Sequence, residues 1–83
     1  MPYERLLKAR KKTIGTKQTM KSIERGQAKV VYIAGNAERH VIDPIIKNCA
    51  AKGVEVIEVD TMLELGKACG IEVGCASAAV VED

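Results

Sequence analysis

Aromatic side chains are nearly absent from this sequence, which has two tyrosines and no tryptophan or phenylalanine among its 83 residues. RRM and OB folds bind nucleic acid by stacking bases on several aromatic rings, so Tyr3 and Tyr32 alone exclude a platform of that kind. Any nucleic-acid recognition must instead use charge, shape, polar side chains and aliphatic contacts.

The residues that catalysis usually requires are also scarce. His40 is the single histidine, and it lies near a predicted helix start, where we expect it to be exposed rather than catalytic. The glycine-rich segment 66–74 lacks the G-x-x-x-x-G-K-[S/T] order that holds nucleotide phosphates. We therefore predict a protein that is not an enzyme and uses no cofactor; a thiol-dependent enzyme is the alternative with the least support.

Cysteine occurs three times, as Cys49, Cys69 and Cys75, without a C-x-x-C pair. An odd number of cysteines in a cytosolic chain predicts reduced, buried thiols. A zinc site from Cys69 and Cys75 with His40 or Cys49 is an alternative only if the fold brings them together. We predict no bound metal.

Long hydrophobic runs are missing as well, so no transmembrane helix is predicted. The N-terminal segment 1–5 is charged and lacks an apolar signal region, so we expect a cytoplasmic protein that does not associate with membranes. Hydrophobic residues make up 47% of the chain, which is enough for one packed core. We predict a single domain over residues 1–83 that is a monomer when free.

The net charge of +2 hides an asymmetry between the two parts of the chain. Residues 1–29 contain nine lysines and arginines against two acids, a net charge of +7. The rest of the chain has four basic residues against nine acids, a net charge of −5. A basic segment on a nearly neutral protein is typical of a protein with a polyanionic partner such as nucleic acid.

Hydrophobic periodicity predicts an alternation of helices and strands. We expect helices at 2–10 (with Pro2 at the first helical position), 16–25, 38–52 and 61–68, and strands ending at 14 and spanning 30–34, 54–59 and 76–81. Pro44 is expected to kink the third helix or to mark its true start. The alternation implies an α/β fold, a three-layer α-β-α sandwich with a four-stranded mixed sheet.

Apolar residues at helical spacing mark the helix faces that we expect to be buried. They are Tyr3, Leu6, Leu7 and the Arg10 stem in the first helix, Thr16, Met20 and Ile23 in the second, and Val41, Ile42, Ile45, Ile46 and Cys49 in the third.

The stretch 14–23 reads as a strand end, a glycine turn and the first turns of a helix. A helix N-terminus has unpaired N–H groups and partial positive charge, so it attracts phosphate, and Gly15 lets the backbone approach a ligand closely. Lys17, Gln18, Lys21 and Arg25 share the helix face opposite the apolar one. We interpret this face as a nucleic-acid contact; an ordinary solvated helix face is the alternative.

Two segments together resemble a known family, the ribosomal proteins of the archaeal seven-Ae and eukaryotic thirty-e types. They are Ile14–Lys21, with the sequence IGTKQTMK, and Leu65–Ala76, with the sequence LGKACGIEVGCA. The apolar strand 31–34 falls where the family has its central strand. The likeness covers essentially the whole chain, and the short length resembles that of the bacterial members.

This resemblance implies an α-β-α sandwich that binds kink-turn RNA, a helix–bulge–helix element bent at tandem sheared G·A pairs. Carried over to this chain, Gly15 is the close-approach position and Thr16 supports the turn, Lys17 and Gln18 lie nearest the bases, and Lys21 contacts a phosphate. Ile71, Glu72 and Val73 match a second RNA-facing loop, which covers a nucleotide flipped out of the bend. The implied partner is a structured RNA, either ribosomal or an mRNA leader.

The chain departs from the archaeal pattern at the position of the two base-proximal residues. Archaeal members have an asparagine–glutamate pair there, whereas Lys17-Gln18 resembles the eukaryotic thirty-e and bacterial forms. Gln18 can both accept and donate at a guanine edge, but Lys17 only donates. A protein–protein adaptor that kept the fold without binding RNA is the main alternative to a ribosome-associated RNA-binding protein.

Overall fold

A computed structural model describes residues 3–83, so the predicted helix position at Pro2 lies outside the described residues. The chain forms four helices and four strands in the order α1 (Glu4–Lys8), β1 (Lys11–Ile14), α2 (Thr16–Glu24), β2 (Val30–Ala34), α3 (Arg39–Lys52), β3 (Glu55–Val59), α4 (Met62–Ala68) and β4 (Ser77–Glu82). Within residues 3–83, no helix has both the length and the apolar character needed to cross a membrane.

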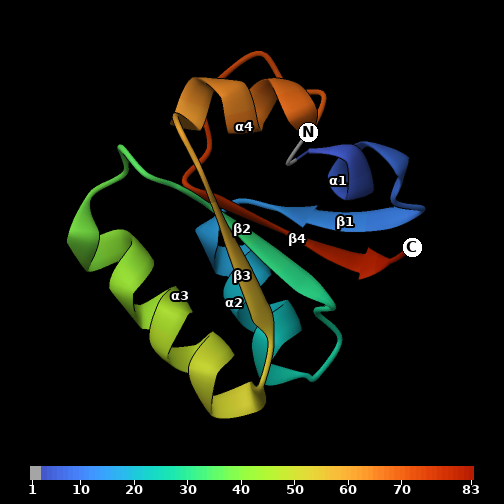
Figure 1. Ribbon diagram of the computed structural model, residues 1–83, viewed down its shortest axis with the longest axis vertical. Coiled ribbons are helices and arrows are strands. Elements are labelled where there is room, and N and C mark those ends of the chain that lie inside the picture. Colours follow the sequence, from blue (N-terminus) through green and yellow to red (C-terminus); the bar gives the residue numbers. More distant parts are fainter. Residues whose placement is uncertain (1–2) are drawn as a thin grey trace.

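The four strands form one mixed sheet in the order β1-β4-β2-β3 (Figure 1). β4 runs antiparallel to both β1 and β2, while β2 and β3 are parallel. The carboxyl ends of β1, β2 and β3 therefore lie at the same end of the sheet as the first residue of β4. The register brings Ile14 opposite Ala78, and Ile33 opposite Ser77, at this end.

Helices cover both faces of the sheet. α2 and α3 pack against each other and against the strands, while α1 and α4 contact the strands from the other side. In Figure 1 α1 and α4 lie above the strands, and α2 and α3 lie below them. The three-layer α-β-α sandwich and the mixed sheet predicted from the sequence are thus confirmed.

The core is centred on β2, in which all five residues, Val30–Ala34, are buried. A strand that is covered on both faces needs apolar side chains at successive positions, which explains the uninterrupted run VVYIA. Its neighbour β4 contributes Ser77, Ala78 and Ala79, all fully buried. These small side chains allow helices to approach the sheet closely on both faces.

The first helix is shorter than predicted. α1 ends at Lys8, and Ala9 is extended (φ −61°, ψ 136°), so Arg10 is not part of the helical stripe. Instead, the N–H of Arg10 donates to the carbonyl of Glu82 at 2.9 Å. A helix of little more than one turn presents one side chain fully inward, and here that residue is Leu6; Leu7, expected to be buried, is 54% exposed.

The buried face of α2 also differs from the prediction of Thr16, Met20 and Ile23. Thr19, Ser22 and Ile23 are the buried residues, whereas Thr16 and Met20 are only partly covered. The hydroxyl groups could be buried because they have partners: Ser22 Oγ donates to the carbonyl of Thr19 at 2.8 Å, and the hydroxyls of Thr19 and Thr13 lie 3.4 Å apart.

The third helix runs without interruption from Arg39 to Lys52 with Pro44 inside it, so the alternative that it begins at Pro44 is wrong. Of the predicted buried stripe, Ile42, Ile45 and Cys49 are buried, whereas Val41 and Ile46 are only partly covered. All three cysteines are free thiols and all three are buried, which confirms that prediction too.

Candidate nucleic-acid interface

The turn between β1 and α2 depends on the backbone of Gly15. Gly15 has φ 95° and ψ 158°, a region that only glycine occupies without strain. Its N–H donates to the carbonyl of Ser77 at 2.9 Å, and its own carbonyl accepts from the N–H of Thr19 at 3.0 Å. Beyond Gly15 and its two chain neighbours, no described atom lies within 4 Å of the place where a Cβ would stand. The turn therefore presents open backbone to its surroundings.

The N-terminus of α2 follows this turn directly. Gly15 occupies the N-cap position and no side chain caps the helix among the described residues. The first N–H groups of α2 therefore have no helical acceptors and carry the positive end of the helix dipole. Lys17 and Gln18, the predicted base-proximal pair, are both exposed in this first turn.

The exposed cations of α2 and of its C-cap residue, Arg25, form a row. Lys17, Lys21 and Arg25 follow one another at intervals of four residues and are all exposed, which places them about 6 Å apart along the helix axis. None of the ion pairs found within residues 3–83 involves any of the three.

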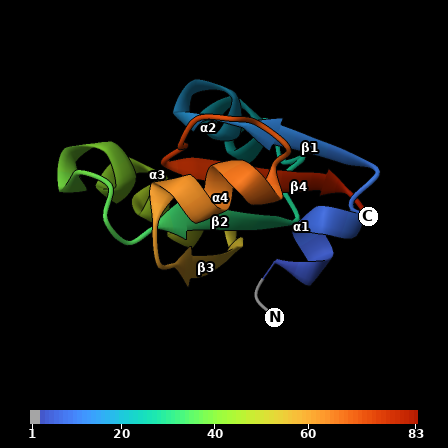
Figure 2. The same cartoon turned by 90° about the horizontal axis from the view of Figure 1, so that it is seen from above.

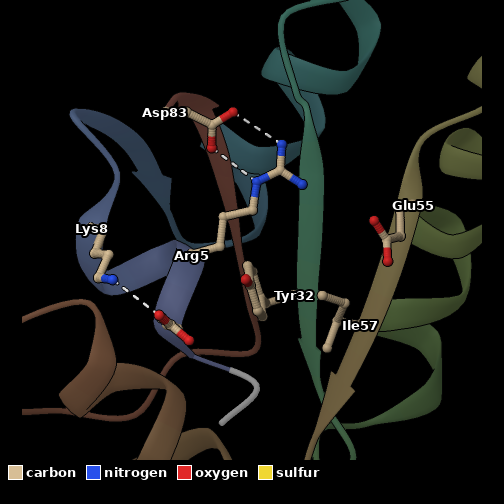
Figure 3. A pocket seen from close by; sticks show the side chains of 7 residues that line it. Arg5, Lys8, Tyr32, Glu55, Ile57 and Asp83 are labelled. Carbon is tan, nitrogen blue, oxygen red and sulfur yellow. Dashed lines mark hydrogen bonds and ion pairs between the residues drawn. The ribbon is translucent and has the colours of Figure 1, made fainter.

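The cations near α1 are in a different state, because carboxylates neutralise them. Arg5 makes a two-pronged pair with Asp83 (2.9 and 3.1 Å), and Lys8 pairs with Glu4 at 3.0 Å. Figure 3 shows these pairs around a hollow of about 580 Å³ beside α1. The hydrogen bond from Arg5 lowers the pKa of the Asp83 carboxyl below its ordinary value. Within residues 3–29, the cations that no carboxylate pairs with are Lys17, Lys21 and Arg25, together with Lys11, Lys12 and Lys29 outside the helix.

The loop 71–73, predicted to be the second RNA-facing element, is fixed against α4. The N–H of Ile71 donates to the carbonyl of Gly66 at 3.0 Å. Gly66 is so close to the loop that a Cβ there would lie 2.0 Å from the carbonyl oxygen of Val73. The loop nevertheless projects outward: Glu72 is exposed, and Val73 is 67% exposed.

The two predicted segments meet through Ser77. This residue begins β4 just after the loop, accepts the hydrogen bond from the N–H of Gly15, and places its Oγ 3.5 Å from the Oγ1 of Thr16. Both views show the connection from α4 entering β4 beside the start of α2 (Figures 1 and 2). The structure thus brings the Gly15 turn and the connection that carries Ile71–Val73 to the same end of the sheet.

Sequence reasoning missed two residues at this end, Ser77 and Asn36. Ser77 is fully buried, and a serine in an alanine-rich strand gave no sign of its partners. Asn36 lies in the turn after β2, and its side-chain oxygen accepts a hydrogen bond from the N–H of Met62 at 2.8 Å. No local pattern connects Asn36 with α4, and only the fold brings this turn beside the first residue of that helix.

The cysteines have no place in this interface. Burial, with a smaller contribution from Cys75, raises the pKa of the Cys69 thiol to about 12, and burial also raises the pKa of Cys75. A thiol with such a pKa stays protonated at neutral pH, which disfavours nucleophilic and metal-ligand roles. Residues 3–83 contain no group of three histidine, cysteine or acidic side chains arranged to hold a metal ion.

Comparison with known proteins identifies the family of this chain. The family model of the Ribosomal protein L7Ae/L30e/S12e/Gadd45 family matches residues 3–83. The chain belongs to this family. The resemblance inferred from the two segments is thereby confirmed for the whole described chain.

Curated relatives extend this assignment. The chain is 46% identical over 71 residues to an RNA-binding protein of Caldanaerobacter subterraneus, covering 86% of this chain and 87% of the relative. It is 41% identical over 81 residues to RNA-binding protein YbxF of Geobacillus stearothermophilus, covering 98% and 99%. Large ribosomal subunit protein eL8 of Halobacterium salinarum is 46% identical over 68 residues, which are 81% of this chain and 57% of that protein.

A solved structure shares the fold of this family member. The 15.5kD RNA binding protein of Giardia lamblia superposes with a TM-score of 0.83 at 25% sequence identity, and the match covers 99% of this chain and 68% of that one.

Proposed function

We propose that this protein is a non-catalytic RNA-binding protein that recognises a kink-turn in structured RNA. The observation that carries the proposal is the Gly15–Ser77 junction, which places the uncapped N-terminus of α2 beside the connection bearing the loop 71–73. The names of its relatives as RNA-binding proteins support RNA as the ligand. The archaeal relative named as a large ribosomal subunit protein supports association with the ribosome.

In this proposal the first turn of α2 enters the widened groove at the sheared G·A pairs. The open backbone at Gly15 permits close approach, and the exposed Lys17 and Gln18 lie nearest the base edges. Gln18 carries both a donor and an acceptor, so it can pair with a guanine edge, while Lys17 donates to acceptors such as O6 and N7.

The row of cations on α2 supplies electrostatic attraction. Lys21 and Arg25 continue from Lys17 at about 6 Å intervals, a spacing similar to that of successive phosphates along one strand. Because no carboxylate within residues 3–83 pairs with them, they can release counterions from the RNA when they bind its phosphates.

The loop 71–73 covers a nucleotide extruded from the bend. Val73 and the partly buried Ile71 offer an aliphatic surface to the face of a splayed base, and Glu72 offers an acceptor to its edge. Because the loop is hydrogen-bonded to α4 before any ligand binds, little ordering is needed on binding.

The decisive experiment measures recognition of the bases separately from electrostatic attraction to the phosphates. Gln18→Ala should weaken binding to a kink-turn by about 1–3 kcal/mol, the scale of one base contact, and should barely affect a straight duplex of equal length. Gln27→Ala is the matched control, because Gln27 is also exposed but follows the far end of α2. Calorimetry on both RNAs gives the four affinities.

If Gln18→Ala weakened binding to kinked and straight RNA equally, the protein would bind phosphates without recognising the kink-turn. If the unaltered protein bound neither RNA, the adaptor function would replace the proposal.

A further inference from the structure

We propose that Asn36 is a positioning residue, which holds the loop 71–73 in the place where it meets RNA. The inference rests on the proposed RNA-binding function and extends it to a residue outside both predicted segments. Asn36 is exposed in the turn between β2 and α3, and it acts on the loop through the first residue of α4.

The first link is the hydrogen bond between Asn36 and α4. The side-chain oxygen of Asn36 accepts from the backbone N–H of Met62 at 2.8 Å, across 26 residues of sequence. Asn36 itself is held in place because the N–H of the preceding residue, Gly35, donates to the carbonyl of Val59 at 2.7 Å. The start of α4 is therefore tied to the end of the sheet.

The second link joins Met62 to the loop. The carbonyl of Met62 accepts from the N–H of Cys75 at 3.0 Å, and a Cβ on Gly74 would lie 3.1 Å from the Cβ of Met62. At the other end of the loop the N–H of Ile71 bonds to Gly66, also in α4. Both ends of the loop are thus hydrogen-bonded to α4, so the loop should move with this helix. The position of the first residue of α4, Met62, depends in turn on Asn36.

Ordinary helix capping does not account for this bond. α4 already has an N-cap, Thr61, whose hydroxyl accepts from the N–H of Glu64 at 3.1 Å. Asn36 adds an acceptor from a turn that is distant in sequence. This hydrogen bond therefore fixes the position of α4 relative to the sheet, whereas Thr61 helps the helix to form. Removing Thr61 Oγ1 and removing Asn36 Oδ1 should therefore have different consequences for RNA binding.

The experiment is a double-mutant cycle on a kink-turn with an extruded nucleotide. Val73→Ala removes the apolar loop contact, and Asn36→Ala should weaken binding about three- to tenfold by displacing the same contact. In the double variant the two losses should overlap, because a displaced loop cannot use Val73. The fold losses of affinity from Asn36→Ala and Gln18→Ala should instead multiply, to within about twofold, in a variant that carries both, because the two sites are independent.

Two further variants separate positioning from stability. Thr61→Ala is the matched control, since it removes the other cap of α4 and should lower stability without overlapping with Val73→Ala. In the free protein, hydrogen exchange at the amides of Met62 and Cys75 should accelerate in Asn36→Ala. Asn36→Asp keeps the acceptor and should restore slow exchange at both amides.

The proposal would be overturned if the affinity losses of Asn36→Ala and Val73→Ala were independent in the double variant. It would also be overturned if the loss from Thr61→Ala overlapped with that of Val73→Ala to the same extent. Unchanged exchange at the Cys75 amide in Asn36→Ala would overturn it as well. The exchange measurement needs no RNA, so it distinguishes failure of this link from failure of the proposed function, which would appear as no preference of the unaltered protein for kinked RNA.

Discussion

The backbone N–H of Gly15 donates a hydrogen bond to the carbonyl oxygen of Ser77 across 2.9 Å, joining two residues 62 positions apart in the chain. This bond continues the antiparallel pairing of β1 with β4 by one residue beyond Ile14 and Ala78. It fixes where the strand stops and α2 starts. The direction in which the N–H groups of α2 point therefore depends on one glycine.

We expect Gly15→Ala to weaken RNA binding and to destabilise the fold. The backbone at Gly15 is strained for a residue with a Cβ, at a cost of about 1–3 kcal/mol, and relief of that strain would turn the start of α2. Urea denaturation gives the stability, and RNA affinity is then measured where the variant is folded.

Gly53→Ala is the control for this change. Gly53 also has a positive φ, 70°, but it ends α3 and precedes β3, at the opposite end of the sheet from Gly15. It should lose about 1 kcal/mol of stability with no change in RNA affinity. A Gly15→Ala protein that was folded and bound a kink-turn normally would show that the turn geometry is not used.

Lys21→Ala should lower the salt dependence of binding. If Lys17, Lys21 and Arg25 each contact one phosphate, the logarithm of the affinity should fall with the logarithm of salt concentration at a slope of roughly −2 to −3, and loss of Lys21 should reduce its magnitude by about one. The effect should be equal on kinked and straight RNA, because phosphate contacts carry no sequence information.

Lys8→Ala provides the comparison within the same basic segment. Lys8 lies on α1 and pairs with Glu4 at 3.0 Å, so its removal should change the slope much less. Equal changes for Lys8→Ala and Lys21→Ala, in titrations at four or more salt concentrations, would mean that the whole basic segment attracts RNA diffusely.

The sequence predicted the fold because local signals and the global pattern agree in it. The run Val30–Ala34 was expected to be a strand from its continuous apolar residues, and the third helix ends at Lys52 as predicted. The predictions failed where tertiary contacts decided the outcome. The rotation of α2 that buries Thr19 and Ser22 depends on hydrogen-bond partners in β1 and within the helix, and a pattern of apolar residues gives no sign of a buried hydroxyl.

The residues of the candidate interface could be predicted from the sequence, but the contacts that hold them together could not. Lys17, Gln18 and Lys21 could be assigned from helical spacing and from resemblance. Which cations remain unpaired depended on contacts with the C-terminal residues, such as Arg5 with Asp83, 78 positions apart. The hydrogen bond from Met62 to Asn36 likewise joins segments that no local pattern connects.

Cys49→Ser should destabilise the protein by about 1–3 kcal/mol, because Cys49 is fully buried and a hydroxyl there would lack a partner. Cys49→Ala removes the sulfur without adding a polar group, so it should cost less than the serine variant. Urea denaturation compares the two. RNA affinity of the folded variants should be unchanged, because α3 lies outside the proposed contact; a loss of affinity would place the thiol in the binding function.

Stability should fall at alkaline pH because of Cys69. Its thiol has a pKa of about 12 in the folded protein, raised chiefly by burial from 9.0. Above pH 9 the unfolded chain has lost the thiol proton that the folded chain retains, so unfolding releases a proton and becomes easier as pH rises. The contribution of this group to stability is fully present below pH 9 and should then decline by about 1.4 kcal/mol per pH unit.

Cys69→Ala isolates that dependence from the titration of other groups. The alanine variant should be less stable than the unaltered protein at pH 7, since Cys69 is buried, but the difference should narrow between pH 9 and pH 10.5. Urea denaturation at four pH values under reducing conditions measures it. A difference that stayed constant across this range would mean that the Cys69 thiol ionises as easily in the folded protein as in the unfolded chain, and that its burial does not hold the proton.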